Sequence, residues 1–85
     1  MTDHVMTSWY GKFRGVIGRY PEHGDRYLFP FDDVHAVPVH MLGVRRPLIV
    51  EWWADAQLVE RRTLEPWWDS HTEQADLVIE KPIPE

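Results

Sequence analysis

The sequence lacks cysteine, which excludes disulfide bonds, thiolate metal sites, iron–sulfur clusters and thiol nucleophiles. It also lacks an excess of basic charge, because the formal net charge is −5 at pH 7. Nucleic acids and anionic membrane surfaces both attract basic protein surfaces, so we expect neither as a partner. The longest run without charge, residues 35–44, is far shorter than the ~20 apolar residues that span a bilayer.

Several sequence signals are missing as well. The start, Met1-Thr2-Asp3-His4, is not a basic stretch followed by an apolar one, so we expect no signal peptide and a cytoplasmic protein. The glycine-rich stretch 11–18 matches neither a P-loop nor a dinucleotide fingerprint, and we expect no cofactor. With 85 residues, 44% of them hydrophobic, the chain predicts a single domain, residues 1–85, with a folded core over 7–82 and loose termini.

Hydrophobic periodicity predicts one short helix followed by strands. Apolar residues from Trp9 to Ile17 recur at helical spacing, between an N-cap at Thr7 or Ser8 and a C-cap at Gly18. Strand patterns then occupy residues 27–31, 34–43, 47–53, 57–64 and 76–81, with turns at 32–33 and 54–56 and a polar loop at 66–74. We therefore predict a mainly β fold, a small antiparallel β-barrel or sandwich with one short N-terminal helix.

The same patterns predict a core around one centre. Its members share an inward position on the predicted helix or strands and are Trp9, Phe13, Ile17, Leu28, Leu48, Val50, Trp52, Leu77 and Ile79.

The five histidines do not form a metal-ligand motif. His35 and His40 lie five residues apart in a predicted strand, which places them on opposite faces unless a bulge at Pro38 intervenes. A loop carboxylate, Asp32 or Asp33, would be a further ligand. Because the spacing matches no known ligand pattern, we expect no metal site, and a chelator should leave the thermal midpoint unchanged.

Glu51 is the main candidate for acid–base chemistry. It stands in an apolar strand between Val50 and Trp52, where burial would raise the pKa of its carboxyl group. The alternative is an ion pair with Arg61 or Arg62 across the predicted hairpin. No serine lies in a nucleophile elbow.

Hairpin geometry predicts a second site. If strands 47–53 and 57–64 pair around Asp55, facing residue numbers add to 111 or 112, and Arg45 and Arg46 lie where Trp67 and Trp68 begin. The predicted ligand-binding residues are Arg45, Arg46, Trp67, Trp68 and His71. Guanidinium groups and indoles together hold a planar anion by bidentate hydrogen bonds and stacking. The alternative is that both arginines stack on the indoles and pair with Glu65 or Asp69, merely closing this end of the fold.

Four motifs in order resemble a known family. They are Gly15-Val16-Ile17-Gly18-Arg19, Tyr27-Leu28-Phe29-Pro30-Phe31, Val39-His40-Met41 and Pro47-Leu48-Ile49-Val50-Glu51-Trp52-Trp53. These motifs resemble those of domain-of-unknown-function family 192, an uncharacterised ancient conserved region group, and of its short archaeal members. The resemblance extends from about Thr7 to Pro82. The resemblance implies a compact, mostly antiparallel β fold with one helix, and no established reaction, cofactor or catalytic residue.

The chain departs from the family pattern at polar positions. Leu42-Gly43-Val44 stands where many members have Lys-Asn-Thr, Ile49 replaces an Asp, and residues 54–56 lack the usual hairpin glycine. If those positions form a site in other members, we expect it to be weakened here.

Three functional hypotheses remain. The first is a non-catalytic module that binds a small ligand, such as an anion, or a protein. The second is a small hydrolase-like or metal-dependent enzyme that uses Glu51 with His35 or His40. The third is a structural module that oligomerises through exposed tryptophans. The oligomeric state and the identity of the partner stay open.

Overall fold

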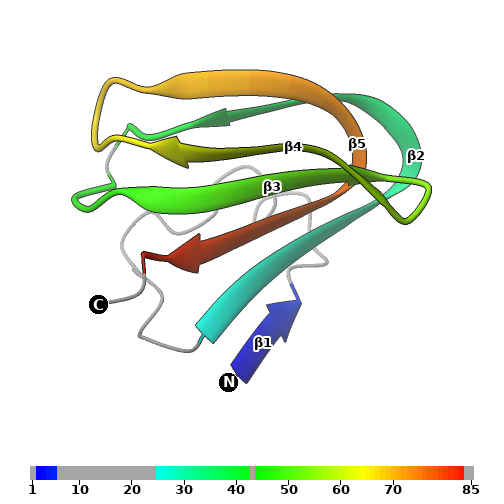
Figure 1. The fold of residues 1–85 in the computed structure, drawn as a ribbon, viewed down its shortest axis with the longest axis horizontal. Coiled ribbons are helices and arrows are strands. Elements are labelled where there is room, and N and C mark those ends of the chain that lie inside the picture. Colours follow the sequence, from blue (N-terminus) through cyan, green and yellow to red (C-terminus); the bar gives the residue numbers. More distant parts are fainter. Residues whose placement is uncertain (1, 6–24, 43, 84–85) are drawn as a thin grey trace.

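The computed structural model describes residues 2–5, 25–42 and 44–83, which form a five-stranded sheet (Figure 1). The strands are β1 (Thr2–Val5), β2 (Asp25–His40), β3 (Leu48–Ala54), β4 (Gln57–Leu64) and β5 (Ser70–Pro82). Their order is β1-β2-β5-β3-β4; β1 is parallel to β2, and the other four strands pair antiparallel. The prediction of a mainly β, antiparallel fold is confirmed.

The fold prediction also included a barrel or sandwich and an N-terminal helix. The pairings of the described strands form an open sheet with β1 and β4 as its edges, so backbone closure into a barrel is not shown. The predicted N-terminal helix, with Trp9, Phe13 and Ile17, lies outside the described residues.

The prediction of two strands separated by a turn at Asp32-Asp33 is wrong, because β2 is continuous over 16 residues. Pairing with β5 is regular as far as Pro30 and resumes at His35. Proline donates no ladder hydrogen bond, and the two aspartates are exposed to water. The polar residues therefore interrupt the pairing locally, as a bulge does, without reversing the chain.

The predicted polar loop 66–74 is also partly wrong, because β5 begins at Ser70. Residues 70–75 pair with residues 35–40 of β2. His71 and Glu73 are half-buried and alternate with exposed Thr72 and Gln74. Polar residues on both faces hide the period of two that identifies most strands.

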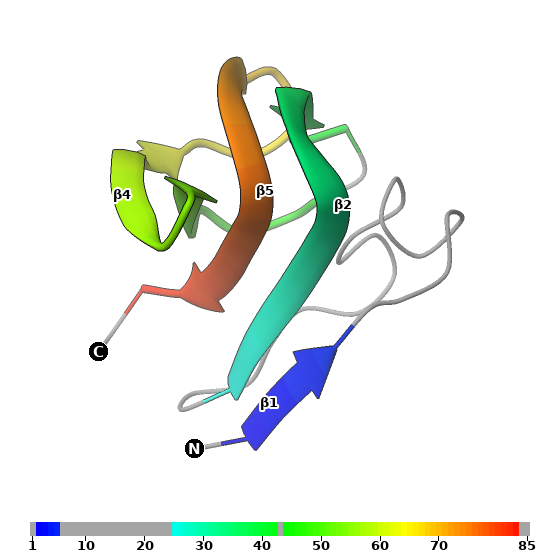
Figure 2. The same ribbon diagram turned by 90° about the vertical axis from the view of Figure 1, so that its right-hand side faces the viewer.

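The long strands β2 and β5 lie side by side and bend strongly (Figures 1 and 2). Their bend brings the first half of β5 near β4, although β4 pairs only with β3. Side chains of β4 and β5 therefore meet across the open part of the sheet.

The register assigns side chains to an inner and an outer face. The inner face carries the core, which consists of Tyr27, Phe29, Val37, Val39, Met41, Val44, Leu48, Val50, Trp52, Leu64, Ala75 and Val78. The predicted core positions Leu48, Val50 and Trp52 are confirmed. Ile79 pairs with Leu28 and with Glu51, which places it on the outer face.

The predicted burial of Ile79, which is 7% exposed, is confirmed, but the prediction that Leu28, Leu77 and Ile79 belong to the inner core is wrong. Successive side chains of a strand point to opposite faces, and β5 directs Val78 and Glu80 inward.

The β3–β4 hairpin follows the predicted pairing. Facing residue numbers add to 112 from Leu48 to Trp52 and to 111 at Trp53 and Ala54, because Val59 forms an irregularity between the two registers. The turn residues Asp55 and Ala56 have φ values of 51° and 64°. Positive φ at both central residues is the geometry of a type I′ turn, whose twist matches the flanking strands.

Candidate functional site

The predicted arginine–tryptophan site lies at one end of the sheet. Leu48 pairs with Leu64 there, so the segments that precede β3 and follow β4 start side by side. The Trp67 amide donates to the Met41 carbonyl over 3.1 Å, and the Met41 amide donates to the Asp69 carbonyl over 3.0 Å. We call this end, formed by residues 41–42, 44–47 and 65–69, the loop pole.

Of the two tryptophans of the loop pole, Trp67 has an unusual backbone conformation and Trp68 is unusually exposed. Trp67 has a φ of 72°, in the left-handed region that bulky residues rarely adopt. The side chain of Trp68 is 90% exposed, and that of Trp67 is 45% exposed. Such strain costs about 1–3 kcal/mol and persists only where the surrounding structure fixes it. Here the Trp68 amide donates to the Pro66 carbonyl over 2.8 Å, which fixes the turn.

The arginines of the loop pole are both exposed. Among the described residues, none forms an ion pair with Arg45. The Asp69 carboxylate instead accepts a hydrogen bond from the Glu65 amide over 2.7 Å. Asp69 therefore stabilises its own loop and is not a counter-ion for Arg45.

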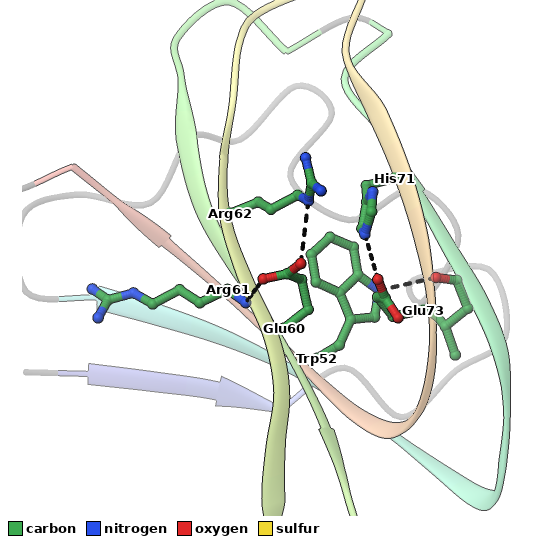
Figure 3. Close-up of polar contacts among 7 residues, drawn as sticks. Trp52, Glu60, Arg61, Arg62, His71 and Glu73 are labelled. Atoms are coloured by element: carbon green, nitrogen blue, oxygen red, sulfur yellow. Dashed lines mark hydrogen bonds and ion pairs between the residues drawn. The ribbon is translucent and has the colours of Figure 1, made fainter.

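His71, the fifth predicted residue, has other partners (Figure 3). Its Nε2 atom lies 2.6 Å from Oε2 of Glu73, and its ring packs edge-on against Trp52 with centroids 5.1 Å apart. Trp52 is fully buried, and its Nε1 donates to the Val37 carbonyl over 2.9 Å. The buried indole therefore fixes the position of the imidazole.

Glu60 of β4 completes a cluster that the sequence analysis missed. One ligand atom from each of Glu60, His71 and Glu73 lies within 4.8 Å of the others, and all three side chains are half-buried. The Glu60 carboxylate accepts a hydrogen bond from the Arg61 amide over 2.9 Å and lies 3.6 Å from Nε of Arg62 (Figure 3). We call these three residues the Glu60–His71–Glu73 cluster.

One part of this cluster had a signal in the sequence. His71 and Glu73 are two residues apart, so on a strand they share a face. The polar composition of residues 66–74 predicts a loop and conceals this signal. Glu60 had no comparable signal, since only the bend of the sheet brings β4 to β5.

Glu51, the predicted acid or base, is buried on the outer face and fully paired. Its carboxylate accepts from Nζ of Lys81 at 3.0 Å and from Nε1 of Trp53 at 3.1 Å, and it lies 3.6 Å from Nε of Arg61. Burial by itself raises its pKa, but the hydrogen bonds from Lys81 and Trp53 and the nearby positive charges outweigh burial and place the pKa below its usual range.

The ion-pair alternative for Glu51 is thus confirmed for Arg61. A carboxyl group with a lowered pKa does not hold a proton near neutral pH. Glu51 therefore lacks the raised pKa that would favour acid catalysis.

The two histidines named with Glu51 are engaged elsewhere. His35 lies 2.8 Å from the Asp33 carbonyl and packs edge-on against Phe31. His40 accepts a hydrogen bond from the Leu42 amide over 3.3 Å. Among the described contacts, none joins either histidine to Glu51.

Glu80 is a second buried carboxyl group that the sequence analysis missed. It is 6% exposed on the inner face, where it pairs in register with Tyr27 and Val50. Burial raises its pKa to about 7. Unlike Glu51, it has no ion pair with any described residue.

Comparisons with known proteins add no neighbour. No family model matches the chain, and no curated protein or solved structure is significantly similar to it. The resemblance to domain-of-unknown-function family 192 therefore stays a prediction. No helix long and apolar enough to cross a membrane occurs in the described part of the chain.

Proposed function

We propose that the protein is a non-catalytic binding module that takes a small planar organic anion at the loop pole. One observation carries this proposal: Trp68 is 90% exposed on a loop that holds Trp67 at a φ of 72°. An indole in water contributes nothing to the core, so packing does not explain why a tryptophan stands at position 68. Strain of this kind is concentrated at binding sites.

The chemistry of the loop pole favours an aromatic carboxylate. An exposed indole offers a flat apolar face for a ring. A guanidinium group binds a carboxylate through two parallel hydrogen bonds, and the Arg45 side chain is exposed without an ion-pair partner among the described residues. The side chains that support the site are therefore Arg45, Arg46, Trp67 and Trp68, without His71.

The test is a titration with benzoate, followed through the indole N–H and arginine Nε–H signals in NMR spectra. We expect saturable shifts of the Trp68 and Arg45 signals at millimolar benzoate. The double variant Arg45→Ala, Arg46→Ala and the variant Trp68→Ala should both lose them. Arg61→Ala, which removes one positive charge from the outer face of β4, is the matched control and should retain binding.

Two results would contradict the proposal. One is the absence of any saturable shift. The other is a Trp68 shift that depends on protein concentration and not on benzoate, which would support the oligomerisation hypothesis.

A further inference from the structure

The Glu60–His71–Glu73 cluster shares no residue with the proposed anion site. We infer that this cluster binds a divalent transition-metal ion of the zinc class, held by Nε2 of His71 and one carboxylate oxygen each from Glu60 and Glu73. The inference is independent of the proposed function.

The donor set determines the class of ion. Imidazole nitrogen together with carboxylate oxygen suits zinc and its neighbours in the first transition series. Magnesium and calcium prefer oxygen ligands alone. Three protein ligands leave a further coordination position for water or for a ligand atom.

The distances fit a metal site after small side-chain rotations. In a tetrahedral zinc site with bonds of about 2.0–2.1 Å, the ligand atoms are about 3.4 Å apart. Here the three atoms lie within 4.8 Å of one another, and Nε2 of His71 is 2.6 Å from Glu73. An ion between them would widen the shortest separation slightly and draw Glu60 inward. Glutamate has enough rotatable bonds for both movements.

The surroundings orient two of the ligands. The buried Trp52 ring contacts the His71 imidazole and is itself fixed by a hydrogen bond to Val37. The Arg61 amide holds Oε1 of Glu60 (Figure 3). Contacts of this kind around metal ligands reduce the freedom that binding must remove, and their loss weakens metal affinity.

The local charge favours a cation. Two carboxylates face the imidazole, and Arg62 is a nearby positive charge, with its side chain 51% exposed and its Nε 3.6 Å from Glu60. The net charge of −5 adds a long-range attraction for cations. Arg62 therefore competes with the ion for Glu60, and its removal should strengthen metal binding.

The position in the fold suggests what the ion does. Glu60 belongs to an edge strand that does not pair with β5, whereas His71 and Glu73 belong to the first half of β5. An ion bound by all three would link these strands where the backbone does not. It would stabilise the folded protein, because a ligand that binds only the folded state shifts the equilibrium by mass action.

The histidine spacing predicted no metal site, but two of the three ligands here are carboxylates. The alternative role for the same residues is pairing within each strand, of His71 with Glu73 on β5 and of Glu60 with Arg62 on β4. That role requires no ion, so metal titration separates the two.

The experiment is a titration of the chelator-treated full chain with Co²⁺ and Zn²⁺. We expect one ion per chain, visible Co²⁺ absorption of a four- or five-coordinate site, displacement by Zn²⁺, and a higher thermal midpoint with Zn²⁺. Mg²⁺ should compete poorly. Glu60→Gln and Glu73→Gln should each weaken binding about tenfold or more, because losing even an outer-shell contact of a metal ligand costs about 10–100-fold in affinity. Arg62→Gln should strengthen it.

His35→Asn and Glu65→Gln are matched controls, because each removes an exposed group of the same type outside the cluster. Both should bind as the unaltered protein does. Amide NMR spectra establish that each variant is folded, and Glu60→Gln carries the test if Glu73→Gln unfolds the chain. Unchanged affinity in Glu60→Gln, loss of binding in His35→Asn, or no binding at equimolar Zn²⁺ would overturn the inference.

Discussion

The buried Glu80 carboxyl group should make the protein less stable as the pH rises towards neutrality. Its side chain is 6% exposed on the inner face, beside Tyr27 on β2 and Val50 on β3. Among the described residues, none provides a charge to offset the loss of hydration. The folded protein therefore favours the protonated form, and the pKa of Glu80 is raised to about 7 from its usual 4.5.

The sign and the size of the effect follow from these two values. Below pH 4.5 both the folded and the unfolded protein carry the proton, and Glu80 causes no penalty. Between pH 4.5 and about 7 the unfolded protein releases the proton first, so the free energy of unfolding falls as the pH rises. The whole interval corresponds to roughly 3 kcal/mol, at about 1.4 kcal/mol for each pKa unit.

Glu80→Gln keeps the shape of the side chain and removes its titration. We expect the variant to gain roughly 3 kcal/mol relative to the unaltered protein between pH 4 and pH 8. Urea unfolding followed by tryptophan fluorescence, at one pH per unit across this range, measures the difference. Glu65→Gln, on an exposed side chain, is the control and should show no such trend. A difference that stays constant with pH, or grows towards acid, would refute the reasoning.

Three further predictions concern stability. Val50→Ala removes part of a fully buried side chain and should cost about 2 kcal/mol in urea unfolding, whereas Val59→Ala, 45% exposed, should cost little; equal costs would contradict the assigned faces. Ala56→Gly should stabilise the protein by about 1 kcal/mol, because glycine adopts a φ of 64° without strain, and a lower thermal midpoint would contradict this. Glu51→Gln should destabilise the protein at pH 7. The contacts that lower the pKa of Glu51 stabilise its charged form, so this loss of stability should shrink as the pH falls below 4.5. A loss that grows below pH 4.5 would contradict the prediction.

Local sequence was sufficient for the β3–β4 hairpin. The pattern predicted β4 at the residues that the structure assigns, Gln57–Leu64, and it left two alternative registers, both of which occur in the hairpin. It also predicted that Trp52 points inward, and it offered Arg61 or Arg62 as an alternative partner for Glu51, of which the structure shows Arg61. These features depend on side-chain alternation and on a short turn, and both are properties of neighbouring residues.

The sequence by itself thus determined the β class and the hairpin. It also determined that the segments containing Arg45 and Trp67 meet at the same end of this hairpin. Only the tertiary structure decided that β2 is continuous, that the first half of β5 is a strand, and that Glu60 meets His71. Each of these depends on pairing between residues far apart in the chain, and polar side chains on both faces conceal such pairing. The pairing of β2 with β5 is interrupted between Pro30 and His35, where a bulge bends a strand, and the bend brings together the Glu60–His71–Glu73 cluster.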